Sequence, residues 1–456
     1  MKKFLETIEN IWKIEELRTR ILFTLGMLLV FRLGSHIVLP GVNPGVLSSA
    51  TQSNPNDLLG LINVFTGGAF NKAAIFALGI MPYITASIII QLLGFAVPYF
   101  QKLQQKEGES GRKKLTQITR WLTVPITLVQ GGGYLTWISA QGAVAPGMPQ
   151  ALFWFSNIII LSTGTIFAMW LGEKITDRGI GNGVSLLIMI GIIAALPQAF
   201  IFEFTSQVEQ GGLIVFIVEI IALVVVIMAT ILIIQAVRKI PIQFAKRAVG
   251  RSDSSIPMAG VRDYIPLKVN AAGVMPIIFA QALMFLPATV NQWVNSSGSE
   301  LSGSGLLNAL NDFTSIPYNV VYFVLVVLFT YVYTALIVNP KQYAEYLKRQ
   351  NAFIPGVKPG KNTADFIDSI TSRITFPGSI FLGFISILPA IVAAFGVNVA
   401  FAMFFGGTSL LILVGVILDT LQQIESYLLM RKYEGLVKSG KVQGRRSGMQ
   451  SIGANF

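Results

Sequence analysis

Cysteine is absent from this 456-residue sequence, histidine occurs once, and charged residues make up only 12% of the chain. Without cysteine the chain forms no disulfide and offers no thiolate to a metal, and one histidine leaves little for a catalytic cluster. We therefore expect no cofactor, no metal site and no enzymatic activity. Soluble domains carry about 25% charged residues. The low charge, together with 53% hydrophobic residues, indicates a chain whose main solvent is lipid.

The N-terminus lacks the uninterrupted apolar stretch of a cleavable signal peptide. Four glutamates break up this region, namely Glu6, Glu9, Glu15 and Glu16. We therefore expect the segment to be retained. Its apolar residues recur at helical spacing, which predicts an amphipathic helix on the membrane surface over residues 3–18, within an N-terminal region 1–19.

Long segments almost free of charge follow, each with about the 20 residues that an α-helix needs to cross the hydrocarbon core. They predict an all-α polytopic membrane protein with ten transmembrane helices. The expected spans are 20–38, 72–97, 117–138, 152–171, 183–200, 213–235, 267–290, 319–338, 374–395 and 399–420.

Among the connecting loops, lysine and arginine occur only in alternate ones, and the net charge is +12. They occur at the N-terminus, after the second, fourth, sixth and eighth spans, and in the C-terminal tail 421–456. The opposite loops contain none, over residues 40–71, 139–151, 201–212, 291–318 and 395–399. Because Lys and Arg stay in excess on the cytoplasmic side, both termini are predicted to be cytoplasmic. That arrangement requires an even number of spans and fits ten.

A six-residue pattern occurs in both the second and the seventh span. Gly79–Ile84 has the sequence GIMPYI, and Gly273–Ile278 has the sequence GVMPII. Each is the second helix of a five-helix half, the first half being 20–200 and the second 201–235 with 267–420. Because five is odd, the second half enters the membrane upside down, which predicts two inverted repeats with a functional site between them. Chance similarity of two apolar helices is the alternative.

The first outward loop contains a short apolar piece, residues 58–65, ahead of a break at Gly67 and Gly68. It is too short to span the membrane. It is therefore either a re-entrant segment buried in protein or an interfacial loop helix.

Ionisable residues inside the spans are few, which disfavours an ion-coupled transporter. Arg32 and Glu219 are expected to have structural roles, and His36 is not expected to bind a ligand. The glycine-rich stretch Gly179–Gly183 lacks the βαβ context of a nucleotide-binding loop, so we interpret it as a tight cytoplasmic turn.

Isoleucines on one face of the second span suggest a pore constriction. Ile80, Ile84 and Ile88 follow one another at four-residue spacing, and Ile278 is the repeat partner of Ile84. A narrow ring of such side chains would close a pore by excluding water.

Motifs along nearly the whole chain resemble those of the SecY family, the central subunit of the bacterial Sec translocon. They are Ala77–Ile84, Lys106–Arg112, Asp177–Gly183, Pro266–Asn270, Phe353–Gly356, Gly406–Ile412 and Tyr433–Leu436. The resemblance implies an hourglass channel between the two halves, with a constricting ring, a plug at 58–68, and a lateral gate between spans two and three and spans seven and eight.

The resemblance also assigns residues to these parts. The ring would consist of Ile80, Ile84, Val184, Ile188, Ile278 and Ile412. The plug would contain Leu58, Leu59, Leu61, Ile62, Val64, Phe65, Gly67 and Gly68. Polar contacts at the lateral gate would come from Gln91, Gln130 and Asn270.

The basic cytoplasmic loops 236–266 and 339–373 would bind the ribosome or the SecA ATPase, with Arg247 and Lys358 as contacts. The family commonly has an arginine where this chain has Lys358, which keeps the charge but loses a planar bidentate contact. Further implied partners are the small SecE and SecG membrane subunits, precursor polypeptides and membrane lipid. The implied location is the bacterial inner membrane.

The sequence thus predicts a passive, gated channel that passes unfolded secretory polypeptides and releases hydrophobic segments sideways into the bilayer. A secondary transporter of a small solute is the alternative, because inverted repeats and broken helices are common there too. A membrane scaffold without a pore is a third possibility.

Overall fold

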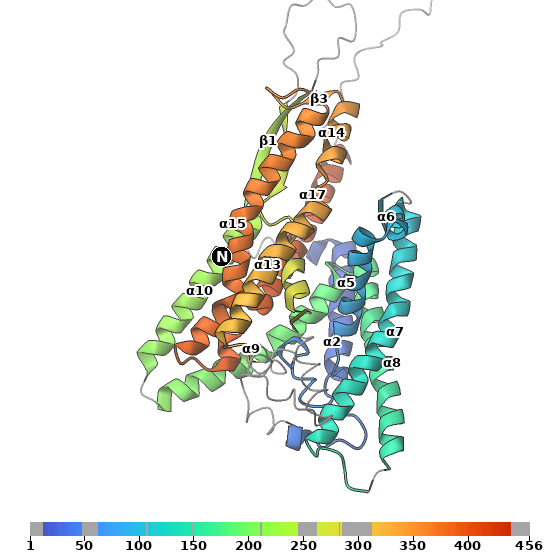
Figure 1. Cartoon of the computed structure of the whole chain (residues 1–456), viewed down its shortest axis with the longest axis vertical. Helices are drawn as coiled ribbons and strands as arrows, with labels where there is room; N and C mark the ends of the chain where they lie inside the picture. The colour runs from blue at the N-terminus through green and yellow to red at the C-terminus, as the bar shows by residue number, and fades with distance from the viewer. Residues whose placement is uncertain are drawn as a thin grey trace, which may run out of the picture.

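Long helices stand side by side with a small sheet at one end of the molecule (Figure 1). The computed structural model describes residues 12–47, 63–105, 108–147, 149–209, 212–244, 262–281, 283–284 and 312–438. Within these residues, six helices are long and apolar enough to cross a membrane. They are α8 (Gln150–Arg178), α9 (Gly183–Glu209), α10 (Leu213–Gln235), α13 (Ile316–Ile337), α15 (Lys361–Ala394) and α17 (Gly407–Lys438).

The remaining expected spans have charged or broken ends. α2 (Glu15–Gly34) and α7 (Gly108–Ala140) begin with charged turns. α5 (Met81–Ala96) and α6 (Pro98–Gln105) meet at a bend of 103°, where Pro98 follows an extended residue. A further helix runs from residue 275. The described residues are thus mostly long helices, six of them apolar enough to cross a membrane, and the predicted class of polytopic helical membrane protein is confirmed.

The two halves of the chain lie next to each other. α2, α5, α7 and α8 form one group and α10, α13, α15 and α17 the other (Figure 1). α9 belongs to the first half by sequence, yet it packs against α8 on one side and α17 on the other. It therefore connects the two groups.

The repeated motif adopts the same backbone form in both halves. Gly79 and Gly273 have φ values of 53° and 63°, which favour glycine. The helices that follow begin at residues 81 and 275, each with a proline in its first turn. Both therefore start later than the expected span boundaries of 72 and 267, because the left-handed glycine ends the preceding turns.

Other helix ends also differ from the expected boundaries. α2 begins at Glu15, inside the region 1–19, and α17 continues past residue 421. An ion pair between Glu16 and Arg20, at 3.0 Å, supports the charged first turns of α2. Apolar runs mark where hydrocarbon begins, whereas helices extend into water as long as capping and side-chain pairs support them.

The tenth span is broken rather than continuous. A short helix, α16 (Val399–Ala402), precedes a turn at 403–406, and α17 begins at Gly407 with φ of 63°. A Cβ at Gly406 would lie 2.4 Å from the carbonyl oxygen of Ile385 on α15. Only glycine fits this close approach, so α15 fixes where the span is interrupted.

The basic loops 236–266 and 339–373 contain β-strands, which the all-α expectation did not include. β1 (Val237–Phe244) pairs antiparallel with β2 (Arg262–Lys268) and, at its other edge, with β3 (Ala352–Phe353). Ile240 and Ile242 alternate with exposed neighbours and pack with Leu347 of α14 (Pro340–Arg349). This period-two burial gives the sheet its own small core beyond the ends of the spans.

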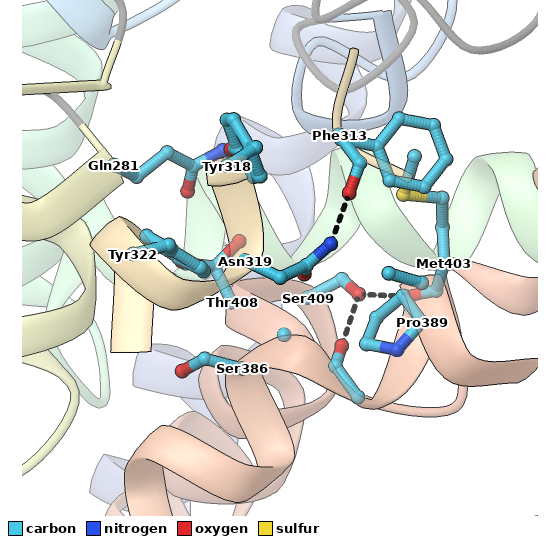
Figure 2. Close-up of a pocket in the computed structure, with 13 residues that line it drawn as sticks. Gln281, Phe313, Tyr318, Asn319, Tyr322, Ser386, Pro389, Met403, Thr408 and Ser409 are labelled. Atoms are coloured by element: carbon cyan, nitrogen blue, oxygen red, sulfur yellow. Dashed lines mark hydrogen bonds between the residues drawn. The ribbon is translucent and has the colours of Figure 1, made fainter. Parts of the chain in front are cut away.

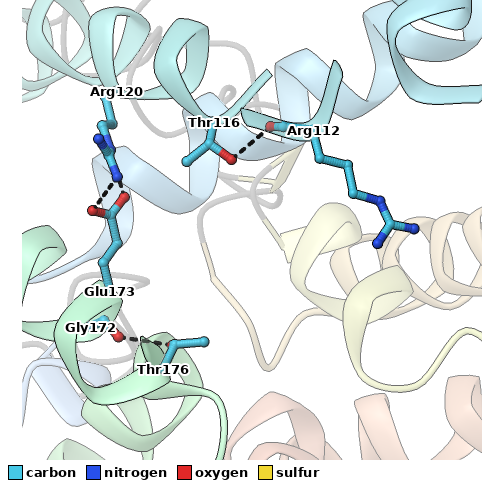
Figure 3. A network of polar contacts seen from close by, with 6 residues as sticks. All are labelled: Arg112, Thr116, Arg120, Gly172, Glu173 and Thr176. Carbon is cyan, nitrogen blue, oxygen red and sulfur yellow. Dashed lines mark hydrogen bonds and ion pairs between the residues drawn. The ribbon is translucent and has the colours of Figure 1, made fainter. Parts of the chain in front are cut away.

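An ion pair joins α7 to α8 on the first half. Arg120 donates from Nε and Nη2 to the two carboxylate oxygens of Glu173, at 2.8 and 2.7 Å (Figure 3). Such a planar double contact is geometrically specific and orients the two helices. Arg112, two turns earlier on α7, points away from this pair (Figure 3).

Glu219 on α10 accepts a hydrogen bond from a glutamine of the preceding helix, as expected for a residue with a structural role. Gln207 on α9 donates to Oε1 of Glu203 at 2.7 Å and to Oε1 of Glu219 at 3.3 Å. The backbone N–H of Asn398, before α16, donates to the other oxygen of Glu203 at 3.0 Å. This buried polar group therefore ties α9, α10 and the start of α16 together.

Candidate pore constriction and lateral seam

The side chains expected to form a ring meet in one hydrophobic cluster, although they come from both halves. Its predicted members lie on α5, α9, the helix from residue 275 and α17, and they are Ile80, Ile84, Val184, Ile188, Ile278 and Ile412. Ile80, Ile188 and Ile412 are 5%, 7% and 3% exposed, and the other three are half-buried against the same cluster. The space between the halves is closed here by apolar side chains.

Local sequence explains how each helix supplies its members. Val184 and Ile188 are four residues apart in the first turns of α9, so they face the same direction. Ile80 is the N-cap residue of α5, immediately after the left-handed Gly79. The start of each helix thus places its apolar side chains in the cluster.

Part of the expected plug packs on the same cluster. Phe65 is buried in it and Val64 packs against it. The following Gly67 has φ of 63°, and its carbonyl oxygen accepts a hydrogen bond of 2.7 Å from Nη1 of Arg32. Four of the plug residues, Leu58, Leu59, Leu61 and Ile62, lie outside the described residues.

A close backbone approach holds this segment against α9. A Cβ at Gly191 would lie 2.3 Å from the carbonyl oxygen of Phe65 and 3.2 Å from the nitrogen of Gly67. Glycine at position 191 is therefore required for the contact. Neither Arg32 nor Gly191 stood out in the sequence as a plug contact, because nothing local to either residue identifies its distant partner.

In the described part of the chain, a polar contact joins the two halves where α5 meets α13, a boundary called the seam here. Tyr333 on α13 donates a hydrogen bond from its hydroxyl to Oε1 of Gln91 on α5. Ile88 and Phe279 are buried beside it, and the rings of Phe279 and Tyr333 lie 5.0 Å apart in an edge-on arrangement. Gln91 thus lies where a lateral gate was expected, with Tyr333 as a partner that the sequence did not reveal.

The other two residues expected at the gate differ from Gln91. Asn270 is 7% exposed in the turn before the helix from residue 275, and its Oδ1 has no hydrogen-bond partner among the described residues. Gln130 is half-buried on α7. Within the described residues, only Gln91 of the three makes a hydrogen bond across the seam.

Of the two residues expected to contact a partner, Lys358 and Arg247, only Lys358 lies among the described residues. Lys358 is exposed in the loop between β3 and α15, and its carbonyl oxygen accepts a 2.9 Å hydrogen bond from Oγ1 of Thr363. Arg247 lies outside the described residues. The strands on either side of it carry exposed basic side chains, including Arg238 and Arg262. The loops expected to bind a partner therefore present positive charge.

His36 lies just beyond the end of α2. Its Nδ1 is 3.3 Å from Nζ of Lys72. The cation of Lys72, followed by burial and by Arg32, lowers the pKa of His36. The neutral imidazole is therefore favoured and can accept a hydrogen bond from Lys72.

A small cavity of about 30 Å³ lies in the second half, and none of the ring residues lines it. Figure 2 shows polar side chains around it, among them Gln281, Asn319 and Ser409. Asn319 donates to the carbonyl oxygen of Phe313 at 2.8 Å. The volume suits one or two water molecules. In the part of the chain that the structure describes, no three His, Cys, Asp or Glu residues are grouped as metal ligands.

Known proteins are similar to this chain over most of its length. Residues 74–421 match the SecY family model. The protein translocase subunit SecY of Streptomyces coelicolor is 43% identical over 440 residues, which cover 94% of this chain and 98% of that relative. A second translocase subunit SecY, from Aquifex aeolicus, is 40% identical over 95% of this chain and 99% of its own length.

Solved structures show the same fold at low identity. A structure described as a protein conducting channel matches with a TM-score of 0.63 and 19% identity, over 93% of this chain and 95% of that one. Sec61 in the canine ribosome-channel complex from the endoplasmic reticulum matches with a TM-score of 0.59 and 17% identity, at the same coverage. From the family match and the close relatives, the chain belongs to the SecY family.

Proposed function

We propose that this chain is the pore-forming subunit of a bacterial protein translocase. It passes unfolded secretory polypeptides across the membrane and releases hydrophobic segments sideways into the lipid. The observation that carries the proposal is the cluster in which apolar residues of both halves meet, with Phe65 as one of its buried members. An apolar constriction stops ions by excluding water, yet it makes no fixed polar bonds with a passing chain of arbitrary sequence.

The relatives support a polypeptide as the substrate. They are named protein translocase subunits, and a structural neighbour is described as a protein conducting channel. The small-solute transporter has no comparable support from these relatives. In addition, the buried carboxylates Glu203 and Glu219 lie with Gln207 at the α9–α10 junction, and neither belongs to the ring cluster.

The seam around Gln91 and Tyr333 is the proposed lateral gate. It is held by a hydrogen bond and a small apolar cluster between α5, the helix from residue 275 and α13. Contacts of this size separate and re-form readily, because a single hydrogen bond contributes about 1 kcal/mol. A hydrophobic signal sequence would replace the apolar contacts as it moves between the helices.

The proposed partners bind the basic cytoplasmic side. A matched channel structure is that of a ribosome-bound complex. Exposed Lys358 and the basic residues of β1 and β2 suit ribosomal RNA or the acidic surface of a motor ATPase such as SecA. The small subunits SecE and SecG would bind along the spans. The bacterial inner membrane with both termini cytoplasmic is the proposed location, and the channel itself would catalyse no reaction.

Crosslinking of a translocating chain tests the proposal directly, because the protein contains no cysteine. Single cysteines replace Ile84, Ile188, Ile278 or Ile412, and each variant is engaged by a stalled secretory precursor that carries a thiol-reactive probe. The control is Ile417→Cys, a 39% exposed position on the outer face of α17. We expect crosslinks at all four ring positions and none at residue 417. An engaged precursor that crosslinks at none of the four would refute the central route.

A further inference from the structure

The cytoplasmic turn Gly179–Gly183 joins both halves of the molecule. The backbone N–H of Ile180 donates to Oγ1 of Thr24 on α2, at 3.1 Å. The next N–H, of Gly181, donates to Oε1 of Gln423 on α17, at 2.8 Å. Residues 181 and 423 are 242 positions apart in the sequence. The turn is therefore bonded to the first helix of one half and the last helix of the other.

Glycine is required at three places in this turn, each for a different neighbour. A Cβ would lie 2.4 Å from Oγ1 of Thr24 at Gly179, 3.1 Å from Oγ1 of Thr420 at Gly181, and 1.9 Å from the carbonyl oxygen of Gly172 at Gly183. Gly181 also has φ of 81°. The motif thus lets α2, α8 and α17 approach one turn at the same time.

The backbone N–H groups of the turn, which a phosphate would need as donors, already donate hydrogen bonds to side-chain oxygens. Besides the bonds to Thr24 and Gln423, the N–H of Gly183 donates to Oγ1 of Thr176 at 2.9 Å. Asn182 accepts from the N–H of Val184 at 3.1 Å. The glycine-rich turn is therefore a structural junction and not an anion site.

This junction lies next to two sections of the ring. α9 begins at Gly183, so the turn sets the position of Val184 and Ile188. α17 carries both Ile412 and Gln423, and α9 packs against α17. The hydrogen bond from Gly181 to Gln423 therefore links the backbone that presents the α9 ring residues to the helix that presents Ile412.

We propose that Gln423 is a positioning residue for the pore constriction. By accepting the N–H of Gly181, it holds α17 against the start of α9 and keeps Ile412 packed with Ile188. The inference rests on the proposed ring. It assigns to an exposed cytoplasmic glutamine a role in keeping water out of a distant apolar cluster.

The test measures how fast water reaches the ring. Ile188→Cys is introduced into the full chain, and its labelling by a water-soluble maleimide is followed in proteoliposomes. Gln423→Leu removes the acceptor, whereas Gln423→Glu keeps an oxygen that accepts the same N–H. Gln422→Leu, at the exposed neighbouring position, is the matched control. Because Gln423 is exposed, its replacement is compatible with folding. The amount of each variant that is inserted into the proteoliposomes is compared with that of the parent.

We expect labelling about fivefold faster in Gln423→Leu, the population shift that follows from losing one hydrogen bond. Gln423→Glu and Gln422→Leu should match the parent. Equal rates in Gln423→Leu and the parent, or equal acceleration in Gln423→Glu, would overturn the positioning role. Ile412→Asn serves as the reference. If Ile412→Asn speeds labelling and Gln423→Leu does not, the result supports the proposed ring and refutes the positioning role of Gln423. If Ile412→Asn has no effect, the ring itself is wrong.

Discussion

Ile412 is one of the buried side chains of the proposed pore constriction. It is 3% exposed in a cluster built from α5, α9, α17 and the plug segment. Its neighbours in that cluster are hydrophobic, with Tyr83 the member that carries a hydroxyl, so water that entered would find few hydrogen-bond partners among them. The constriction therefore depends on the apolar character of its members more than on any directional contact.

Replacing Ile412 by Asn should hydrate the constriction. A buried amide without partners loses about 1–3 kcal/mol unless water reaches it, so we expect measurable ion conductance through the resting channel. We also expect precursors with defective signal sequences to be transported more readily. Ile84→Asn should behave in the same way. Ile417→Asn, on the exposed face of α17, should leave conductance unchanged. Conductance equal to the parent in both ring variants would argue against the constriction.

Replacing Gly191 by alanine is expected to destabilise the protein, although Gly→Ala in a helix usually stabilises. In an exposed helix interior, Gly→Ala stabilises by about 1 kcal/mol. Here the new Cβ would lie 2.3 Å from the carbonyl oxygen of Phe65, so the plug segment must shift. We expect Gly191→Ala to lower the midpoint of thermal unfolding and to raise resting conductance. Gly26→Ala, with no atom within 4 Å of its Cβ, is the control and should not lower it. A rise in the midpoint for Gly191→Ala would contradict the close approach.

The elements of the two halves contact each other in two different ways. α9 and α17 share an apolar cluster and the junction at Gly181, whereas α5 and α13 meet through Gln91 and Tyr333. Among the described residues the seam is the smaller contact, since four buried residues, Ile88, Ala272, Phe279 and Tyr333, form its cluster. It is therefore the side on which the helices should separate first.

Tyr333→Phe tests the seam with little change in shape. The variant keeps the edge-on packing with Phe279 and removes the hydroxyl that bonds to Gln91. We expect easier lateral opening, measured as a several-fold increase in transport of a precursor with a weakened signal sequence, because about 1 kcal/mol of closure is lost. Tyr331→Phe, on the more exposed face of α13, should have no effect. Parent-like transport in both Tyr333→Phe and Gln91→Leu would show that this bond does not hold the gate.

The molecule has an apolar helical bundle and, at one end, a basic region. β1, β2 and α14 form a small separate core around Ile240 and Leu347, with lysines and arginines on its surface. This rigid platform presents positive charge beyond the ends of the spans. It suits partners that bind through phosphate or carboxylate groups.

Lys358→Glu should therefore impair translocation while leaving membrane insertion intact. The change reverses a charge on the exposed loop ahead of α15 and repels an acidic or RNA partner. We expect lower transport in a reconstituted assay, with partial recovery of Lys358→Glu at raised salt, because salt screens exposed charges. Lys358→Arg keeps the charge and should transport like the parent. Lys341→Glu on α14 is the charge-matched comparison. Normal transport by Lys358→Glu would exclude this residue as a docking contact.

The sequence alone determined the membrane class and the number of spans. Those features follow from hydropathy and from the basic loops, which are local in the chain, whereas the full set of ring residues came from the resemblance to the family and stays a prediction. Helix boundaries were less accurate. Charged turns extend α2 and α17 beyond their apolar stretches, and glycine breaks delay the start of α5.

Only the tertiary structure identified the partners of Gln91, Gly181 and Gly67. Tyr333 and Gln423 are each 242 residues from the groups they bind, and Arg32 is 35 residues from Gly67. Such pairs depend on how each helix is rotated and on how closely two backbones approach. Hydropathy cannot fix either quantity, since all faces of a transmembrane helix are apolar and packing between helices decides which residues meet.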